Sequence, residues 1–203
     1  MTDRFDPMTL AAYAQHALGY SQDWRDQPPP TDLYALLETH LVAAGETADI
    51  GCGNGRDTAW LAAHGYLVIG FDGSDALLGE ARRLHPGLDF RRAMLPELAE
   101  IEQSFDNMIC ETVIMHLPAA SIPLALEHLI GKLRSGGVLY LSWRVTTGSD
   151  LRHDDGRLYA AFEPSLLLDA LVSCSILHFD DVISASSGKR ICRVIAAKQP
   201  PAR

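Results

Sequence analysis

Three glycines at alternate positions stand between an acidic residue and a predicted helix. They lie in residues 49–55, which read Asp-Ile-Gly-Cys-Gly-Asn-Gly, and the helix is predicted over residues 57–64. Glycine permits positive φ and close approach of the backbone to a ligand. The start of a helix also presents unpaired N–H groups. The spacing therefore predicts a ligand-binding turn between a strand and a helix.

Two acidic residues narrow the choice of ligand. A dinucleotide fingerprint would place its third glycine where Arg56 stands, and no Gly-Lys-Ser/Thr follows as in a Walker A loop. Asp49 would repel a phosphate and suits an ammonium group. Asp72 closes a predicted strand, where a carboxylate can accept both hydroxyls of an unphosphorylated ribose, although it could instead cap the helix that begins near Ser74. We predict a nucleoside that carries an ammonium group.

The elements that hold these residues alternate between strand and helix. Strands are predicted at 46–50, 67–71, 88–92, 106–110 and 137–142, and helices at 57–64, 75–84, 96–102 and 119–134. Repeated strand–helix units imply a parallel sheet with helices on both faces. The chain is predicted to be α/β and doubly wound, with residues 31–203 as one domain.

The regions on either side of this core differ from it in pattern. Residues 1–30 are predicted to be a leader and possible lid, with a helix at 8–18 and the prolines 28–30 before a helix at 33–44. Residues 144–163 are polar and rich in turns, which is typical of a functional or disordered loop. A helix at 164–172 and an antiparallel hairpin of strands 174–180 and 190–197 complete the chain.

The composition restricts partners and compartment. A net charge of −9 over 203 residues argues against a nucleic-acid-binding surface. The four cysteines show no metal-ligand spacing, so no metal site is predicted and a reducing compartment is favoured. No signal peptide is visible, and no apolar run is long enough to span a membrane. We expect a cytoplasmic protein without a membrane partner.

Four ordered motifs resemble those of the class I S-adenosylmethionine-dependent methyltransferases. They are the turn at 49–55, Gly-Phe-Asp-Gly-Ser at 70–74, Phe-Asp-Asn-Met-Ile-Cys at 105–110 and Leu-Arg-Ser-Gly-Gly-Val-Leu at 133–139. The resemblance implies S-adenosylmethionine as the cofactor. It also implies a mostly parallel seven-stranded sheet in the order 3-2-1-4-5-7-6, with the last strand antiparallel.

The resemblance also implies which residues bind the cofactor. They are Asp49, Gly51, Cys52, Gly53, Asn54 and Gly55 at the methionine part, Asp72 and Gly73 at the ribose, Ala93, Met94 and Leu95 at the adenine, and Cys110 near the sulfonium. Many relatives carry an aspartate after the third strand, and this chain does not. Adenine recognition is therefore expected to rest on backbone groups and on Met94, unless Met94 is an ordinary core residue.

Two candidate catalytic residues follow the fourth predicted strand, at the sheet edge where ligands bind. Glu111 and His116 are candidates for acid–base or acceptor contacts. The structural alternatives are a solvated carboxylate for Glu111 and a loop-anchoring role for His116. The leader aromatics and the charged stretch 152–159 are two regions that could close over the acceptor.

The predicted function is methyl transfer to a small-molecule or peptide acceptor by in-line displacement, for which the protein mainly supplies proximity and alignment. A non-catalytic module that binds S-adenosylmethionine or S-adenosylhomocysteine is the alternative. A nicotinamide-dependent oxidoreductase is disfavoured by Arg56 and Asp49. The acceptor atom and the oligomeric state are not predicted.

Overall fold

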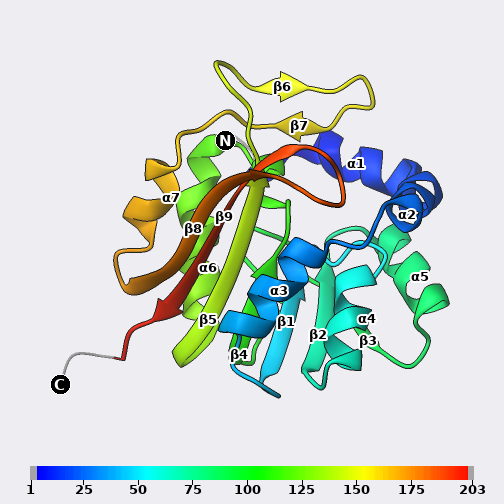
Figure 1. Cartoon of the computed structure of the whole chain (residues 1–203). Coiled ribbons are helices and arrows are strands. Elements are labelled where there is room, and N and C mark those ends of the chain that lie inside the picture. The colour runs from blue at the N-terminus through cyan, green and yellow to red at the C-terminus, as the bar shows by residue number, and fades with distance from the viewer. Residues whose placement is uncertain (1–3, 201–203) are drawn as a thin grey trace.

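A seven-stranded sheet runs through the computed structural model, which describes residues 4–200 (Figure 1). Its strand order is β3-β2-β1-β4-β5-β9-β8. The strands are β1 (Glu46–Ile50), β2 (Leu67–Asp72), β3 (Asp89–Arg92), β4 (Phe105–Cys110), β5 (Leu133–Arg144), β8 (Cys174–Ile183) and β9 (Arg190–Lys198). Strands β1 to β5 pair in parallel, and β9 is antiparallel to β5 and β8. The predicted strand order, with an antiparallel last strand, is confirmed.

Seven α-helices accompany this sheet in the described part of the chain. They are α1 (Pro7–Gln15), α2 (Ala17–Asp26), α3 (Thr31–His40), α4 (Arg56–Ala63), α5 (Asp75–Leu84), α6 (Ile122–Gly131) and α7 (Ser165–Ala170). Short 3-10 turns stand at Ile114–His116 and Ala119–Ser121. The helix predicted at 75–84 is confirmed at both ends. The predicted leader helix is divided at His16 into α1 and α2, and His16 leaves helical geometry with φ −115° and ψ 19°.

The helix predicted at 96–102 is wrong, because this segment is a series of turns without helix. Leu98 has φ +48°, which a right-handed helix does not allow. The side chains of Leu95, Leu98 and Ile101 are all buried. Their spacing of three imitates the period of a helix, although successive turns place them in the core.

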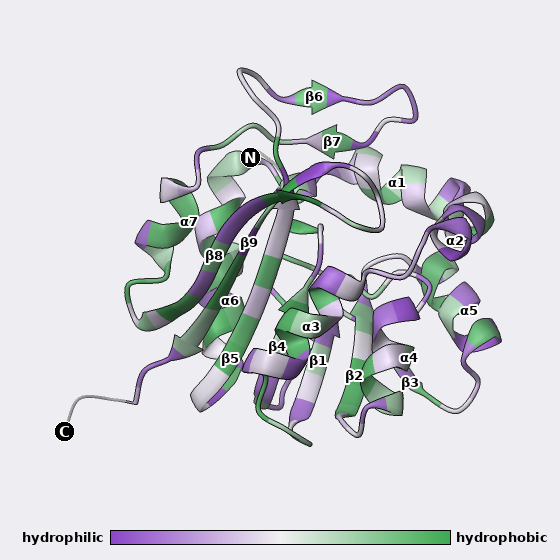
Figure 2. Ribbon diagram, viewed as in Figure 1, coloured by the Kyte–Doolittle hydropathy of each residue, from purple (hydrophilic) through white to green (hydrophobic). Residues whose placement is uncertain are grey.

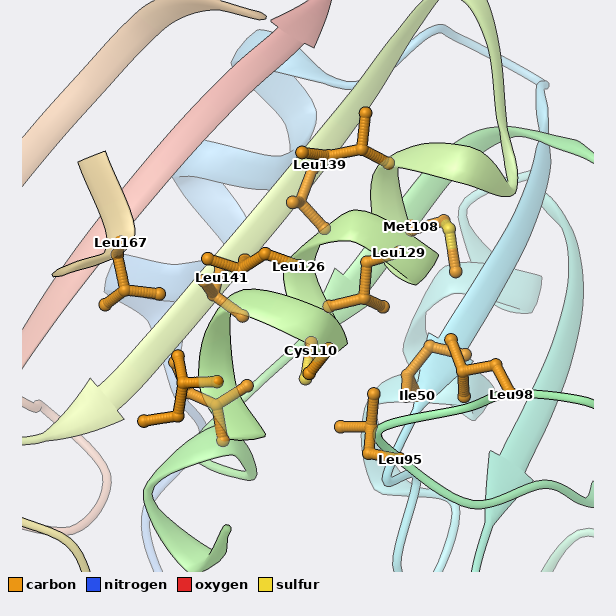
Figure 3. Packing of buried hydrophobic residues seen from close by; sticks show 14 of the residues in the cluster. Ile50, Leu95, Leu98, Met108, Cys110, Leu126, Leu129, Leu139, Leu141 and Leu167 are labelled. Carbon is orange, nitrogen blue, oxygen red and sulfur yellow. The ribbon is translucent and has the colours of Figure 1, made fainter. Parts of the chain in front are cut away.

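The core explains why the central strands are buried along most of their length. In β5, Leu139 and Leu141 join the cluster that contains Leu126 of α6 (Figure 3), whereas Tyr140 joins the cluster that contains Leu37 of α3. Successive strand residues point to opposite faces, so α6 covers one face of β5 and α3 the other. Figure 2 shows hydrophobic residues along both β5 and α6. Burying one such side chain contributes about 1.5–3 kcal/mol.

The polar segment 144–163 is an ordered structure in which β6 (Leu151–Arg152) pairs with β7 (Leu158–Tyr159). This hairpin lies beside α1 (Figure 1), and the N–H of Leu158 donates to the hydroxyl of Thr9 at 2.8 Å. The Arg152 guanidinium forms an ion pair with Asp6 at 2.7 Å. The leader and the hairpin are therefore joined over the sheet edge where the parallel strands end. The division into a leader at 1–30 and a domain from 31 stays a prediction, and residues 1–3 lie outside the described range.

Candidate active site

A cavity of about 450 Å³ lies at the carboxyl ends of β1, β2, β4 and β5. Its volume falls within the range of small-molecule sites. The glycine turn, Asp72, Glu111 and His116 all contribute to its wall. Leader side chains, including those of Tyr13 and Trp24, form part of its wall. One space thus connects the predicted cofactor residues to the predicted catalytic residues.

The glycine turn bends sharply after β1. The N–H groups of Gly51 and Cys52 both donate to the carbonyl of Phe71, at 2.7 and 2.9 Å. Gly51 has φ +73°, and a Cβ at this position would stand 2.3 Å from a methyl carbon of Val113. No side chain fits there, so the backbone of the turn stays open to the cavity.

Asp72 connects the tip of β2 to this turn. Its Oδ2 accepts the N–H of Gly53 at 2.9 Å, and its Oδ1 accepts the N–H of Ser74 at 2.8 Å. Burial raises the pKa of Asp72, and the backbone donors oppose that shift. A carboxylate has about four acceptor sites, so two remain for the hydroxyls of a ligand. The sequence left open that Asp72 caps the helix α5. Ser74 is the capping residue instead, because its hydroxyl accepts the N–H of Leu77.

Asp49 lies behind the turn and is nearly inaccessible to solvent. Its Oδ2 accepts the hydroxyl of Thr58 at 2.6 Å. Burial raises the pKa of Asp49 to about 8, and the neighbouring charge of Asp57 adds to this shift. A cationic group at the turn would favour the ionised carboxylate and lower this pKa.

The predicted adenine region is an apolar slot after β3. Ala93 and Leu95 are buried, and Met94 lies against Gly73, where an added Cβ would stand 2.9 Å from the Met94 Cγ. Leu10 of α1 lies on the same glycine, so the leader also covers this slot. The location of Met94 in the cavity wall favours ligand packing over an ordinary core role.

His116 lies in the cavity wall between α1 and β7. Its Nδ1 lies 2.6 Å from the carbonyl of Leu158, and its Nε2 lies 2.8 Å from the hydroxyl of Tyr13. Because a carbonyl only accepts, Nδ1 carries the proton and the Tyr13 hydroxyl donates to Nε2. Burial lowers the pKa of His116 to about 4, so the ring is neutral near pH 7.

Glu111 is held by two hydroxyl groups of β5. Its Oε2 accepts the hydroxyl of Tyr140 at 2.7 Å and also that of Ser142. Burial raises the pKa of Glu111, and these two donors oppose the shift. The expectation of a solvated carboxylate does not fit this environment.

Aromatic and charged side chains join the leader to the hairpin β6–β7 above the cavity. The Tyr20 and Trp24 rings stack with centroids 6.1 Å apart, and the Tyr20 hydroxyl donates to Asp155 at 2.9 Å. Arg157 pairs with Asp155 and lies 4.5 Å from the Tyr20 ring centroid. Trp24 also covers Gly53, where an added Cβ would stand 2.9 Å from the indole. Both regions expected to close over the acceptor thus meet in one cover.

Most of the predicted site residues share the wall of this one cavity. These are Gly51, Cys52, Gly53, Asn54, Asp72, Gly73, Ala93, Met94, Leu95, Glu111 and His116. Asp49, Gly55 and Cys110 do not face the cavity, and the side chain of Cys110 belongs to the core. Their roles, like those of the others, stay predictions. Sequence reasoning missed the contributions of Tyr140 and Arg144, although Arg144 ends β5 at the same sheet edge.

The class of protein follows from the family comparison. Residues 48–137 match the family described as a methyltransferase domain. Together with the sheet order, this match supports a class I S-adenosylmethionine-dependent methyltransferase.

Individual relatives differ in their acceptors. The chain is 35% identical over 114 residues to a trans-aconitate 2-methyltransferase of Deinococcus radiodurans, covering 55% of this chain and 42% of that protein. It is 31% identical over 159 residues to a tRNA (carboxymethyluridine(34)-5-O)-methyltransferase of Saccharomyces cerevisiae, covering 76% and 55%. The chain thus spans about half the length of these curated relatives.

A solved structure extends the likeness over the leader. The 1,6-didemethyltoxoflavin-N1-methyltransferase of Burkholderia thailandensis, which contains bound 1,6-didemethyltoxoflavin and S-adenosylhomocysteine, superimposes with a TM-score of 0.76. The match covers 95% of this chain and 88% of that one at 21% identity. The two chains therefore share the fold.

S-adenosylmethionine is the cofactor of this family, and the cavity wall fits it. The open backbone of the glycine turn, the remaining acceptor sites of Asp72 and the apolar slot at Met94 suit the methionine part, the ribose and the adenine in turn. Within residues 4–200, no group of three or more metal-ligating side chains is found. In the same range, no helix has the length and apolarity needed to cross a membrane.

Proposed function

We propose that this chain transfers a methyl group from S-adenosylmethionine to a small-molecule acceptor. The observation that carries this proposal is the single cavity that joins the glycine turn and Asp72 to Glu111 and His116. S-adenosylmethionine supplies an activated methyl group on a sulfonium. The turn, Asp72 and the Met94 slot would hold the cofactor, while the protein brings the acceptor into line.

The polar groups opposite the turn orient the acceptor. Neutral His116 is fixed by the Leu158 carbonyl and directs the Tyr13 hydroxyl proton to its Nε2. The Tyr13 oxygen keeps acceptor capacity, so it can receive a proton-bearing group of the acceptor. The cover formed by the leader and the hairpin would limit the access of water to this space.

The cover also supports a compact acceptor. A cavity of about 450 Å³ beneath α1, α2 and β6–β7 suits a metabolite better than a folded polymer. Trans-aconitate, named in one relative, is an example of such a small acceptor. A peptide or a nucleic acid would have to enter as a short extended segment. The four free, buried cysteines favour a reducing, cytoplasmic location.

Two measurements test the proposal. Isothermal titration should show binding of S-adenosylmethionine and S-adenosylhomocysteine, and not of NAD. Incubation with methyl-labelled cofactor and a panel of small acceptors should then give a labelled product. Absence of heat and of a thermal shift with either cofactor form would refute the proposal. Binding without transfer to any acceptor would favour the non-catalytic module.

A further inference from the structure

The cations in the cavity wall differ in whether they have an acidic partner. Those cations are Arg56, Arg144, Arg157, Lys189 and Arg193. Arg56 pairs with Asp57, Arg157 with Asp155, and Arg193 with Asp32 and Asp180. No ion pair to Arg144 or Lys189 occurs within residues 4–200. Lys189 is exposed on the turn between β8 and β9, whereas Arg144 is half-buried.

Arg144 is held over an aromatic ring at the edge of the cavity. Its guanidinium carbon lies 4.9 Å from the centroid of Tyr159, and that of Arg157 lies 5.7 Å from the same centroid. A contact between a cation and an aromatic ring contributes about 0.5–2 kcal/mol, and it does not neutralise charge. Two guanidinium groups thus lie beside one ring, and Asp155 pairs with Arg157 and not with Arg144.

Tyr159 provides a second, independent group that could bind a ligand at this wall. Its side chain is 5% exposed and lines the cavity. Its hydroxyl has no hydrogen-bond partner among the residues that the structure describes, unlike those of Tyr13, Tyr20 and Tyr140. The hydroxyl oxygen is not fully buried, so a ligand in the cavity can reach it. A ligand that only accepts hydrogen bonds would satisfy this hydroxyl and Arg144 together.

We propose that Arg144 and the Tyr159 hydroxyl bind a carboxylate group of the acceptor, so that the acceptors of this protein are small organic acids. This inference rests on the proposed methyl transfer. The planar guanidinium fork matches both oxygens of a carboxylate, and the hydroxyl donates a further hydrogen bond. The residues anchor the acceptor, and its reacting atom is a different one.

The position of Arg144 separates this anchor from the cofactor's own carboxylate. The glycine turn follows β1, whereas Arg144 ends β5, and β4 lies between these strands. Neighbouring strands are about 4.8 Å apart, so Arg144 stands roughly 10 Å along the sheet from the turn. It shares the acceptor side with His116, whose ring centroid is 4.9 Å from that of Tyr159.

The test is acceptor binding to the full chain saturated with S-adenosylhomocysteine. The probes are cinnamate, 4-hydroxybenzoate and trans-aconitate, each compared with its neutral amide by calorimetry. In the unchanged chain, we expect at least one acid to bind about tenfold or more tightly than its amide. Arg144→Gln should bring this ratio to within about twofold, and Tyr159→Phe should reduce it about threefold by removing one hydrogen bond.

Arg134→Gln is the matched control, because it removes the same charge from the other end of β5, where Arg134 pairs with Asp106. It should leave the ratio of acid to amide affinity unchanged. Arg144→Gln should also leave the affinity for S-adenosylhomocysteine within about twofold, since the anchor stands apart from the turn. The ratios are read from heats of binding and do not depend on turnover.

Three results would overturn the inference while leaving the proposed methyl transfer intact. In the first, no acid binds at millimolar concentration or acids and amides bind equally, although S-adenosylhomocysteine binds. In the second, Arg144→Gln leaves the ratio unchanged. In the third, Arg144→Gln weakens S-adenosylhomocysteine about tenfold and does not alter acid binding, which would assign Arg144 to the carboxylate of the cofactor. Failure of S-adenosylhomocysteine to bind the unchanged chain would instead refute the proposed function.

Discussion

The two sides of the cavity are built in different ways. The predicted donor side consists of the glycine turn, Asp72 and the slot at Met94, each of which ends or follows a strand of the sheet. The acceptor side joins Tyr13 to His116 across 103 positions of the chain, and Tyr20 to Asp155 across 135. Backbone geometry dominates the first side and side-chain contacts between distant segments dominate the second. The donor side is therefore built mainly by the sheet, although Leu10 and Trp24 of the leader cover it. The acceptor side depends more on how the leader packs against the hairpin.

The strongest test of the rigid donor side is Gly51→Ala. The new methyl group would meet Val113 while φ stays at +73°, so we expect a loss of about 3 kcal/mol or more in the free energy of unfolding. Binding of S-adenosylhomocysteine should be lost as well. Gly79→Ala in α5 is the control: no heavy atom lies within 4 Å of an added Cβ there, so it should stabilise the chain by about 1 kcal/mol. Denaturant titrations measure both, and equal stability of the two variants would contradict a rigid turn.

Asp49→Asn tests the protonation of the buried carboxyl group beneath the turn. The folded pKa of Asp49, about 8, stands above its ordinary value of 3.8, so the folded chain binds the extra proton and loses stability as pH rises towards 8. His116 acts in the opposite direction, with a folded pKa of about 4 against 6.5, and adds stability as pH rises from 4 to 6.5. Between pH 6.5 and 8, the unchanged chain should lose about 2 kcal/mol that the variant keeps. Parallel stability curves for the two chains would contradict this assignment.

Asp72→Ala tests whether side-chain chemistry matters on the donor side. Removing the carboxylate frees the N–H groups of Gly53 and Ser74 and deletes the acceptor for the ribose hydroxyls. Calorimetry should show S-adenosylhomocysteine bound at least about tenfold more weakly. Asp75→Ala, in which an exposed carboxylate of the next turn is removed, should leave the affinity as it is. Equal affinities in the two variants would exclude Asp72 from cofactor binding.

Tyr13→Phe should have the smallest effect on the free energy of unfolding, and it tests whether the acceptor side can be altered without changing the donor side. The ring remains, but His116 Nε2 loses its donor, at a cost of about 1 kcal/mol in the free energy of unfolding. Transfer to the acceptor should slow about tenfold while cofactor affinity is unchanged. Tyr66→Phe is the control, because the Tyr66 hydroxyl has no hydrogen bond within residues 4–200. The free energy of unfolding and the rate of transfer should both be unchanged in this variant. A large loss of cofactor affinity in Tyr13→Phe would show that the two sides are not separable.

The sequence predicted the donor side of the cavity better than the acceptor side. The ends of β1 and β2 were predicted to within one residue, because apolar runs and glycines mark them locally. The helix wrongly predicted at 96–102 shows the limit of such local patterns. Leu95, Leu98 and Ile101 have the spacing of a helix, although the segment consists of turns and Leu98 has a positive φ. The contact of Arg144 with Tyr159 depends on a hairpin docking onto the leader, and no nearby residue signals it.

The cover over the cavity has a consequence for the timing of the reaction. Trp24 lies against Gly53 and Leu10 against Gly73, two glycines of the predicted cofactor site, so we expect α1 and α2 to move before the cofactor is released. The three prolines at 28–30 join these helices to α3, and proline's fixed φ makes this connection stiff. We expect the leader to swing as one arm, and turnover to slow with rising solvent viscosity because that swing releases the spent cofactor. On this view, motion of the leader sets the rate of turnover, and the sheet holds the reactants in position.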